Sequence, residues 1–140
     1  MQPELFDELQ QILPSDRFQH SASALAAFQS DGLTAFAVQP RAIVVPRTAE
    51  EVITAVKWCH ANNVPFVARG SGTSLSGASL PHAEGIVIAL NRLDKILDID
   101  FESRTARVEP GVINNRLTGA VAHRGLYYAP DPSSQQVCTI

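Results

Sequence analysis

The stretch best suited to chemistry is a glycine- and serine-rich run from residue 67 to 79, VARGSGTSLSGAS. It holds three glycines, four serines and one threonine, and it directly follows a short apolar run. Glycine lets the backbone approach a ligand closely, and successive N–H groups in such a loop can form a concave anion site. The hydroxyl groups add donors, and Arg69 adds positive charge. The composition favours a loop that binds phosphate or pyrophosphate, although a flexible polar turn would have the same composition.

Neither of two well-known phosphate loops is present in this run. The nucleotide-triphosphate loop requires G-x-x-x-x-G-K-[ST], and Gly72 and Gly77 have its spacing, but Ala78 stands where lysine is required. The dinucleotide fingerprint fails because Leu75 occupies its third glycine position. Ser79 occupies the Ser/Thr position of the incomplete triphosphate loop, and we therefore expect it to contribute little.

The elements around the loop follow the order strand, helix, strand. Residues 42–45 are a β-branched run between prolines, and residues 64–68 form a second apolar run, so both are predicted strands. Between them, Thr48 and Glu51 have the spacing of a capping box, and apolar residues in 52–59 recur at helical spacing. This order predicts two parallel strands, with the loop leaving the carboxyl end of the second, where open α/β sheets bind ligands.

The remaining elements are predicted from hydrophobic patterns that are weak before residue 40 and clearer after it. The apolar run 85–90 predicts a strand buried on both faces, and alternating residues predict a hairpin. The remaining predictions are a helix at 3–13, a helical turn at 22–28, hairpin strands at 96–100 and 105–109, and a helix at 114–123. Gly125 has the place of a helix C-terminal cap.

Length, charge and composition limit the classes of function. The chain has 140 residues, enough for one domain, and a net charge of −3 without any basic run, which argues against nucleic-acid binding. No apolar run approaches the ~20 residues that span a bilayer, and the first residues lack the order of a signal peptide. The sequence therefore predicts a cytoplasmic protein with no transmembrane segment, whose two cysteines are reduced.

Three ordered motifs carry a resemblance to a known family. They are residues 67–80, residues 107–112 (RVEPGV) and residues 128–140 (YAPDPSSQQVCTI). They resemble the FAD-binding domain of the vanillyl-alcohol oxidase and p-cresol methylhydroxylase superfamily, and within it the glycolate oxidase D subunits and FAD-linked D-lactate dehydrogenases. The resemblance implies an α/β (α+β) fold: the N-terminal half of such a domain, a small mainly parallel sheet with helices plus the start of an antiparallel part. It also implies a helical extension at residues 1–39 and an FAD-binding domain at 40–140 that is incomplete at its C-terminus.

The resemblance implies two walls for an FAD site. The wall around the pyrophosphate would consist of Arg69, Gly70, Ser71, Gly72, Thr73, Ser74, Ser76 and Gly77. The wall near the ribityl chain would consist of Pro130, Asp131, Ser133 and Ser134. From the residues alone, this second segment could equally be a rigid proline turn. Members that attach the flavin covalently have a histidine where this chain has Thr73, so the resemblance implies non-covalent FAD.

The resemblance also implies an activity, the oxidation of 2-hydroxy acids such as glycolate or D-lactate by hydride transfer to FAD. A glycine-rich segment, the rest of the FAD domain and a substrate-binding cap domain normally follow in this family. Without them we expect no catalytic residue and no turnover in this chain alone, and a poorly ordered tail at residues 127–140. The four histidines of the chain are far apart in sequence and do not have the spacing of a metal site.

A second hypothesis belongs to another class of function. The chain could be a catalytically inactive fragment that acts as a binding or interaction module. Its partners would be FAD, a complementing C-terminal chain or other oxidase subunits, and such subunits would provide any attachment to the inner membrane. A 2-hydroxy acid would bind only to the complete enzyme.

Overall fold

A four-stranded sheet forms the first part of the fold in the computed structural model, which describes residues 4–140. Its strands are β1 (Phe18–Gln19), β2 (Ala42–Val44), β3 (Phe66–Arg69) and β4 (Ile86–Ala89), in the spatial order β1-β2-β4-β3. β2, β4 and β3 are parallel, and β1 is antiparallel at one edge. The predicted parallel strands are therefore confirmed, with β4 inserted between the two strands that α3 connects.

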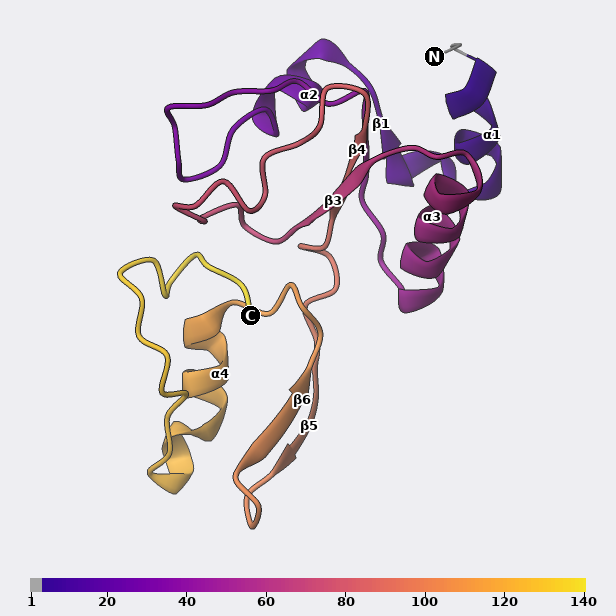
Figure 1. The fold of residues 1–140 in the computed structure, drawn as a ribbon. Coiled ribbons are helices and arrows are strands. Elements are labelled where there is room, and N and C mark those ends of the chain that lie inside the picture. The colour runs from indigo at the N-terminus through magenta and orange to yellow at the C-terminus, as the bar shows by residue number, and fades with distance from the viewer. Residues whose placement is uncertain (1–3) are drawn as a thin grey trace.

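Helices cover both faces of this sheet (Figure 1). α1 (Glu4–Ile12) and α3 (Ala49–Ala61) lie on one side, and α2 (Ala22–Ala27) lies on the other. Successive residues of a strand point to opposite faces. β2 and β4 therefore contribute side chains to a hydrophobic core on each face of the sheet. Every residue of β4 is buried, as its uninterrupted apolar sequence predicts. The core beside α1 and α3 contains Ala42, Val44, Ile86 and Ile88, and the core beside α2 contains Ile43, Val87 and Ala89.

The N-terminus of α3 has the predicted cap and two further bonds to Glu51. The backbone N–H of Glu51 donates to the Thr48 hydroxyl at 3.2 Å, as predicted. The Thr48 backbone N–H in turn helps to lower the pKa of the Glu51 carboxylate. The same carboxylate accepts from the backbone N–H of Arg47 at 2.6 Å and from Nε of Arg17 at 3.0 Å. Glu51 thus ties α3 to the segment before β1, a contact that local spacing cannot reveal.

The bonds to Glu51 predict a pH-dependent stability. Burial acts to raise the pKa of Glu51, but the bonds from Arg47 and Arg17 outweigh it and leave the pKa below its usual value. The stabilising contribution should be complete at pH 7 and lost as the pH falls below about 4.3 and through the lowered pKa. We expect Glu51→Gln to reduce the free energy of unfolding by about 1–2 kcal/mol at pH 7 and by less at pH 3.

Urea unfolding at the two pH values measures this difference. Glu102→Gln is the matched control, because the Glu102 side chain is exposed in the hairpin turn. An equal loss of stability at both pH values for Glu51→Gln would show that the carboxylate charge is not what stabilises this corner.

The second part of the fold is a hairpin with one helix packed beside it (Figure 1). β5 (Ile96–Asp100) pairs antiparallel with β6 (Thr105–Val108), and α4 (Asn114–Val121) follows. A 3₁₀ turn, η2 (Ala122–Arg124), continues α4, and Gly125 caps the end of this turn with φ of 69°, in the place that the sequence predicts. Most residues of both strands are exposed, so the hairpin has little buried surface on either face. The alternating residues had instead predicted one buried and one exposed face. Neither outer edge of the hairpin is paired within residues 4–140.

The N-terminal residues share the core of the sheet. Leu9, Leu13 and Phe18 are buried in the same cluster as β2, β4 and α3. Nε1 of Trp58 on α3 donates to the Glu8 carboxylate on α1 at 3.0 Å. The helix predicted to start at residue 3 is present from Glu4, and residue 3 lies outside the described part of the chain. The boundary between residues 39 and 40 stays a prediction.

The C-terminal tail runs back from α4 to the region between the two parts of the fold (Figure 1). In the first turn of α4, Asn114 and Asn115 donate their backbone N–H groups to tail carbonyls at 2.9 and 3.0 Å. An antiparallel bridge pairs Ile113 with Thr139. The tail therefore has backbone partners that the sequence did not indicate, since it satisfies unpaired N–H groups at the start of the helix. The expectation of a poorly ordered tail stays a prediction.

Candidate functional site

The glycine-rich loop leaves the carboxyl end of β3 and leads to β4. A cavity of about 480 Å³ lies at this edge of the sheet, a size suited to part of a small-molecule ligand. Residues after β2, β3 and β4 all contribute to it. Its lining consists of Ala27, Phe28, Val45, Arg69, Gly70, Ser71, Ala89, Asn91 and Arg92. The loop therefore lies where the strand order predicts a ligand site.

Each glycine of the loop occupies a position that no larger residue fits without movement. Gly72 and Gly77 have φ of 71° and 74°, a left-handed conformation that side chains rarely adopt. A Cβ on Gly72 would lie 2.3 Å from the Arg69 guanidinium. A Cβ on Gly70 would lie 1.9 Å from the Thr139 hydroxyl. Close packing therefore accounts for Gly70 and Gly72, and positive φ accounts for Gly72 and Gly77.

The loop backbone turns one side toward Gly32. The Gly72 carbonyl accepts from the Gly32 N–H at 2.9 Å. The carbonyl oxygens of Thr73 and Ser74 lie 2.9 and 2.8 Å from where a Cβ on Gly32 would be. In a trans peptide the N–H points away from the C=O, so the N–H groups of Thr73, Ser74 and Leu75 face the opposite side. None of these three finds an acceptor among the described residues, which leaves a row of donors suited to an anion.

The Arg69 side chain is buried under the loop and does not extend into solvent. Its Nη1 donates to the carbonyls of Ser30 at 2.6 Å and Phe28 at 3.3 Å. The guanidinium also stacks 5.2 Å from the centre of the Phe28 ring. Burial lowers the pKa of Arg69 from its usual value, and the nearby Asp31 charge acts in the opposite direction. Its direct contact with a pyrophosphate stays a prediction.

The hydroxyls of the three loop serines divide into two groups. Ser71 binds the tail, since its Oγ donates to the Val137 carbonyl and its N–H donates to the Thr139 hydroxyl at 3.4 Å. Ser74 and Ser76 bind each other, with their Oγ atoms 3.1 Å apart. The structure thus brings the tail against the pyrophosphate loop through Ser71, and leaves the other two hydroxyls at the loop surface.

Residues 130–134, the second predicted wall, are held in place by hydrogen bonds to their backbone carbonyls. The Pro130 carbonyl accepts from Nδ2 of Asn114 at 3.0 Å, and the Ser134 carbonyl accepts from the N–H groups of the two residues 137–138. The side chains of Asp131 and Ser133 are exposed. The structure places this segment next to the residues that touch the loop, and the roles of its side chains stay predictions.

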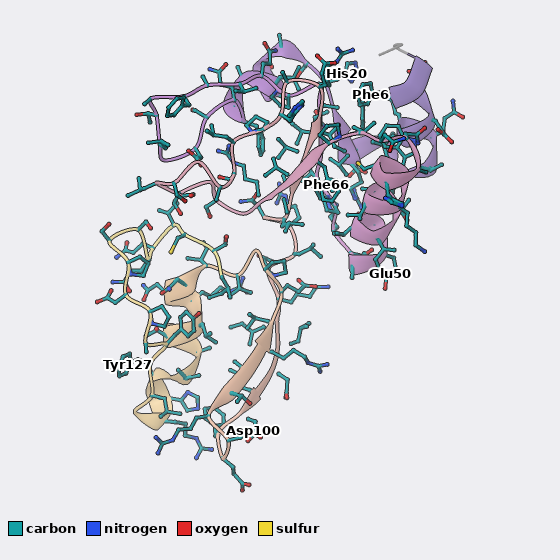
Figure 2. The ribbon with its side chains drawn as sticks, viewed as in Figure 1. Phe6, His20, Glu50, Phe66, Asp100 and Tyr127 are labelled. Carbon is teal, nitrogen blue, oxygen red and sulfur yellow. The ribbon has the colours of Figure 1, made fainter. Side chains whose placement is uncertain are left out.

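A larger cavity of about 550 Å³ lies elsewhere, between the hairpin, α4 and the start of the tail. None of the predicted site residues lines it. Figure 2 shows Asp100 at the hairpin end and Tyr127 beside the end of α4, both on its rim. This cavity is therefore separate from the glycine-rich loop.

The described residues offer neither a metal site nor a membrane span. Over residues 4–140, no group of three or more His, Cys, Asp or Glu side chains could hold a metal ion. No helix in the same range is both long and apolar enough to cross a bilayer. Burial raises the pKa of the Cys59 thiol to about 11, so this cysteine stays protonated and unreactive.

Sequence reasoning missed several residues of this region. Asp31 and Gly32 contact the loop, whereas their sequence indicated a turn and a fit to the family but no such contact. Ser79 is buried, and its hydroxyl donates to the Asp31 carboxylate at 3.2 Å, so it has a structural contact that we did not expect. Asn91 and Arg92 line the cavity directly after β4. Their place at a strand end is the only sequence signal that could have indicated them.

Comparison with known families decides the nature of the cofactor. A sequence profile described as an FAD binding domain matches residues 40–140, which contain the loop and the tail. The chain belongs to this FAD-binding family. FAD is therefore its cofactor, in agreement with the resemblance carried by the three motifs.

Similar sequences include a glycolate oxidase subunit and a D-lactate dehydrogenase. The chain is 42% identical over 132 residues to glycolate oxidase subunit GlcD of Escherichia coli K12, covering 94% of this chain and 26% of that protein. It is 29% identical over 134 residues to a D-lactate dehydrogenase of Anaerostipes hadrus, covering 95% of this chain and 28% of that one. The chain thus spans about a quarter of the length of these relatives.

Solved structures support the fold. An alkyldihydroxyacetonephosphate synthase matches with a TM-score of 0.81 and 25% identity, over 99% of this chain and 30% of that one. p-Cresol methylhydroxylase matches with a TM-score of 0.75 and 22% identity, over 90% of this chain and 26% of that one. The predicted mixed α/β fold is therefore confirmed.

Proposed function

We propose that the loop formed by residues 69–77 binds the pyrophosphate of FAD and that residues 130–134 line the ribityl chain. One observation supports this most directly: the N–H groups of Thr73, Ser74 and Leu75 face outward without acceptors, while the carbonyls of the loop face Gly32. A pyrophosphate carries negative charge and offers acceptor oxygens to these unpaired N–H groups.

The composition of the loop fits this ligand in two further respects. Gly72 and Gly77 present no side chain, so phosphate oxygens can approach the backbone. Ser74 and Ser76 can turn their hydroxyls toward the ligand. The buried Arg69 guanidinium adds positive charge from beneath. Together these residues would bind and orient FAD without supplying a reacting group.

We propose that the complete protein oxidises a 2-hydroxy acid. Support comes from the names of the relatives, one a glycolate oxidase subunit and one a D-lactate dehydrogenase. When bound, FAD accepts a hydride from the carbon that carries the hydroxyl group. In this chain the loop fixes one end of the cofactor and the tail lies against it. No described residue is assigned a catalytic role.

We propose that the flavin is bound without a covalent link. Thr73 stands at the position where covalent members of the superfamily have a histidine, and a hydroxyl offers no imidazole. Precipitating the flavin-loaded protein with acid should release FAD to the supernatant. Yellow colour that stays in the washed pellet would contradict this and point to another attachment residue.

The alternative function is an inactive module that binds a partner. The two unpaired edges of the β5–β6 hairpin favour a complementing chain, and other oxidase subunits are a second kind of partner. We place the protein in the cytoplasm, with attachment to the inner membrane only through such subunits. The chain mixed with FAD and a redox dye should reduce no more dye than free FAD does, with glycolate or D-lactate present. Faster turnover would mean that catalytic groups lie within these residues.

A further inference from the structure

A segment outside the matched family domain runs along the whole glycine-rich loop. It comprises residues 28–33 and is called the strap below. At one end of the strap, the carbonyls of Phe28 and Ser30 accept from the Arg69 guanidinium. Near the other end, a Cβ on Gly77 would lie 3.7 Å from the Leu33 side chain. The family profile begins only at residue 40.

Gly32 makes the closest contact between the strap and the loop. Its N–H donates to the Gly72 carbonyl at 2.9 Å. The space of a Cβ on Gly32 is already occupied by the carbonyl oxygens of Thr73 and Ser74, at 2.9 and 2.8 Å. These distances are too short for any side chain, so the loop can turn its carbonyls inward only because residue 32 is a glycine.

Asp31 fixes the far end of the loop. Its side chain is only 6% exposed, and its Oδ1 accepts from the Leu33 N–H at 2.9 Å. Its Oδ2 accepts from the hydroxyl of Ser79 at 3.2 Å and from the N–H of Ser79 at 3.4 Å. A carboxylate facing a phosphate would repel it. Burial and these donors fit a role in holding the loop rather than in contacting the ligand.

We propose that the strap orients the phosphate loop, with Asp31 and Gly32 as positioning residues. The strap draws the carbonyls of residues 72–74 inward and thereby aims the next N–H groups outward before FAD arrives. A loop that is held in its binding conformation loses less conformational freedom on binding. The role of the strap in affinity rests on the proposed pyrophosphate site, whereas its effect on the loop conformation does not.

The first test measures loop order without any ligand. Heteronuclear ¹⁵N NOE values for residues 73–77 should match those of β3 and β4 in the unmodified chain. They should fall in Gly32→Ala and Asp31→Ala, with an intermediate value in Asp31→Asn, which keeps one acceptor oxygen. Gly119→Ala and Asp98→Ala are controls, since a Cβ on Gly119 meets no described atom within 4 Å and Asp98 is exposed. A loop equally ordered in the Gly32 and Asp31 variants would overturn the proposal.

The second test compares FAD with riboflavin, which lacks the pyrophosphate. Gly32→Ala should weaken FAD binding at least about tenfold and change riboflavin binding by less than twofold, whereas general damage to the fold would weaken both. Unchanged FAD affinity in this variant would also overturn the proposal. If the unmodified chain binds FAD no better than riboflavin, the pyrophosphate site itself is wrong, and the loop-order measurement alone then decides whether the strap holds the loop.

Discussion

Replacing Gly72 by valine is expected to abolish FAD binding. The residue has φ of 71°, which valine adopts only with strain, and a Cβ there would lie within 2.5 Å of three guanidinium atoms of Arg69. The new side chain would also stand where a phosphate approaches the backbone. Losing two hydrogen bonds to a charged ligand costs about 3–6 kcal/mol, which at about 1.4 kcal/mol per tenfold corresponds to at least a hundredfold loss of affinity.

A titration that follows flavin fluorescence measures this loss. Gly125→Val is the matched control, because Gly125 has φ of 69° but no described atom within 4 Å of a Cβ. It carries the same backbone strain without crowding the site, so it should keep its FAD affinity. A Gly72→Val protein that stays yellow with stoichiometric FAD would show that the loop does not hold the pyrophosphate.

Replacing Arg69 by leucine is expected to cause the largest loss of stability. The change removes both hydrogen bonds to the carbonyls of Ser30 and Phe28 and leaves those acceptors without a donor. Each unsatisfied buried group costs about 1–3 kcal/mol. Phe28 and Ser30 are partly buried, so we expect the free energy of unfolding to fall by about 2–3 kcal/mol, near the low end for two groups. Flavin binding should weaken as well, because the strap would lose its anchor at this end.

Urea unfolding measures the change, provided that the slope of the transition stays constant. Arg107→Leu on β6 is the control, because Arg107 is exposed and its replacement removes the same charge from the chain. A loss below about 0.5 kcal/mol for Arg69→Leu, equal to that of the control, would mean that Arg69 is not a structural anchor and remains free to bind a ligand.

Much of the parallel sheet could be predicted from the sequence because its signals are local. β2 and β4 are apolar runs bounded by proline, glycine or polar residues, and α3 has a capping residue and one buried stripe. The order strand, helix, strand then placed the loop at the ligand-binding edge. The three motifs predicted the family, although the roles of the individual residues in the two walls stay predictions.

The contacts that shape the site could not be predicted, because they join residues far apart in sequence. Asp31 and Ser79 are 48 positions apart, and nothing in either neighbourhood indicates the other. β1 has two residues, too few to show any alternation. The tail looked unsupported because its partners, the first N–H groups of α4, are backbone atoms that no side-chain pattern reveals.

The central claim is that the outward N–H groups of the glycine-rich loop bind the pyrophosphate of FAD. An amide ¹H–¹⁵N titration of this chain with FAD tests it most directly, and it works even when affinity is weak. The predicted result is saturable shifts that are largest at residues 72–77, with smaller ones at 130–134, and none at 72–77 with riboflavin. Shifts confined to the cavity between the hairpin and α4, or shifts of equal size with riboflavin, would contradict the claim.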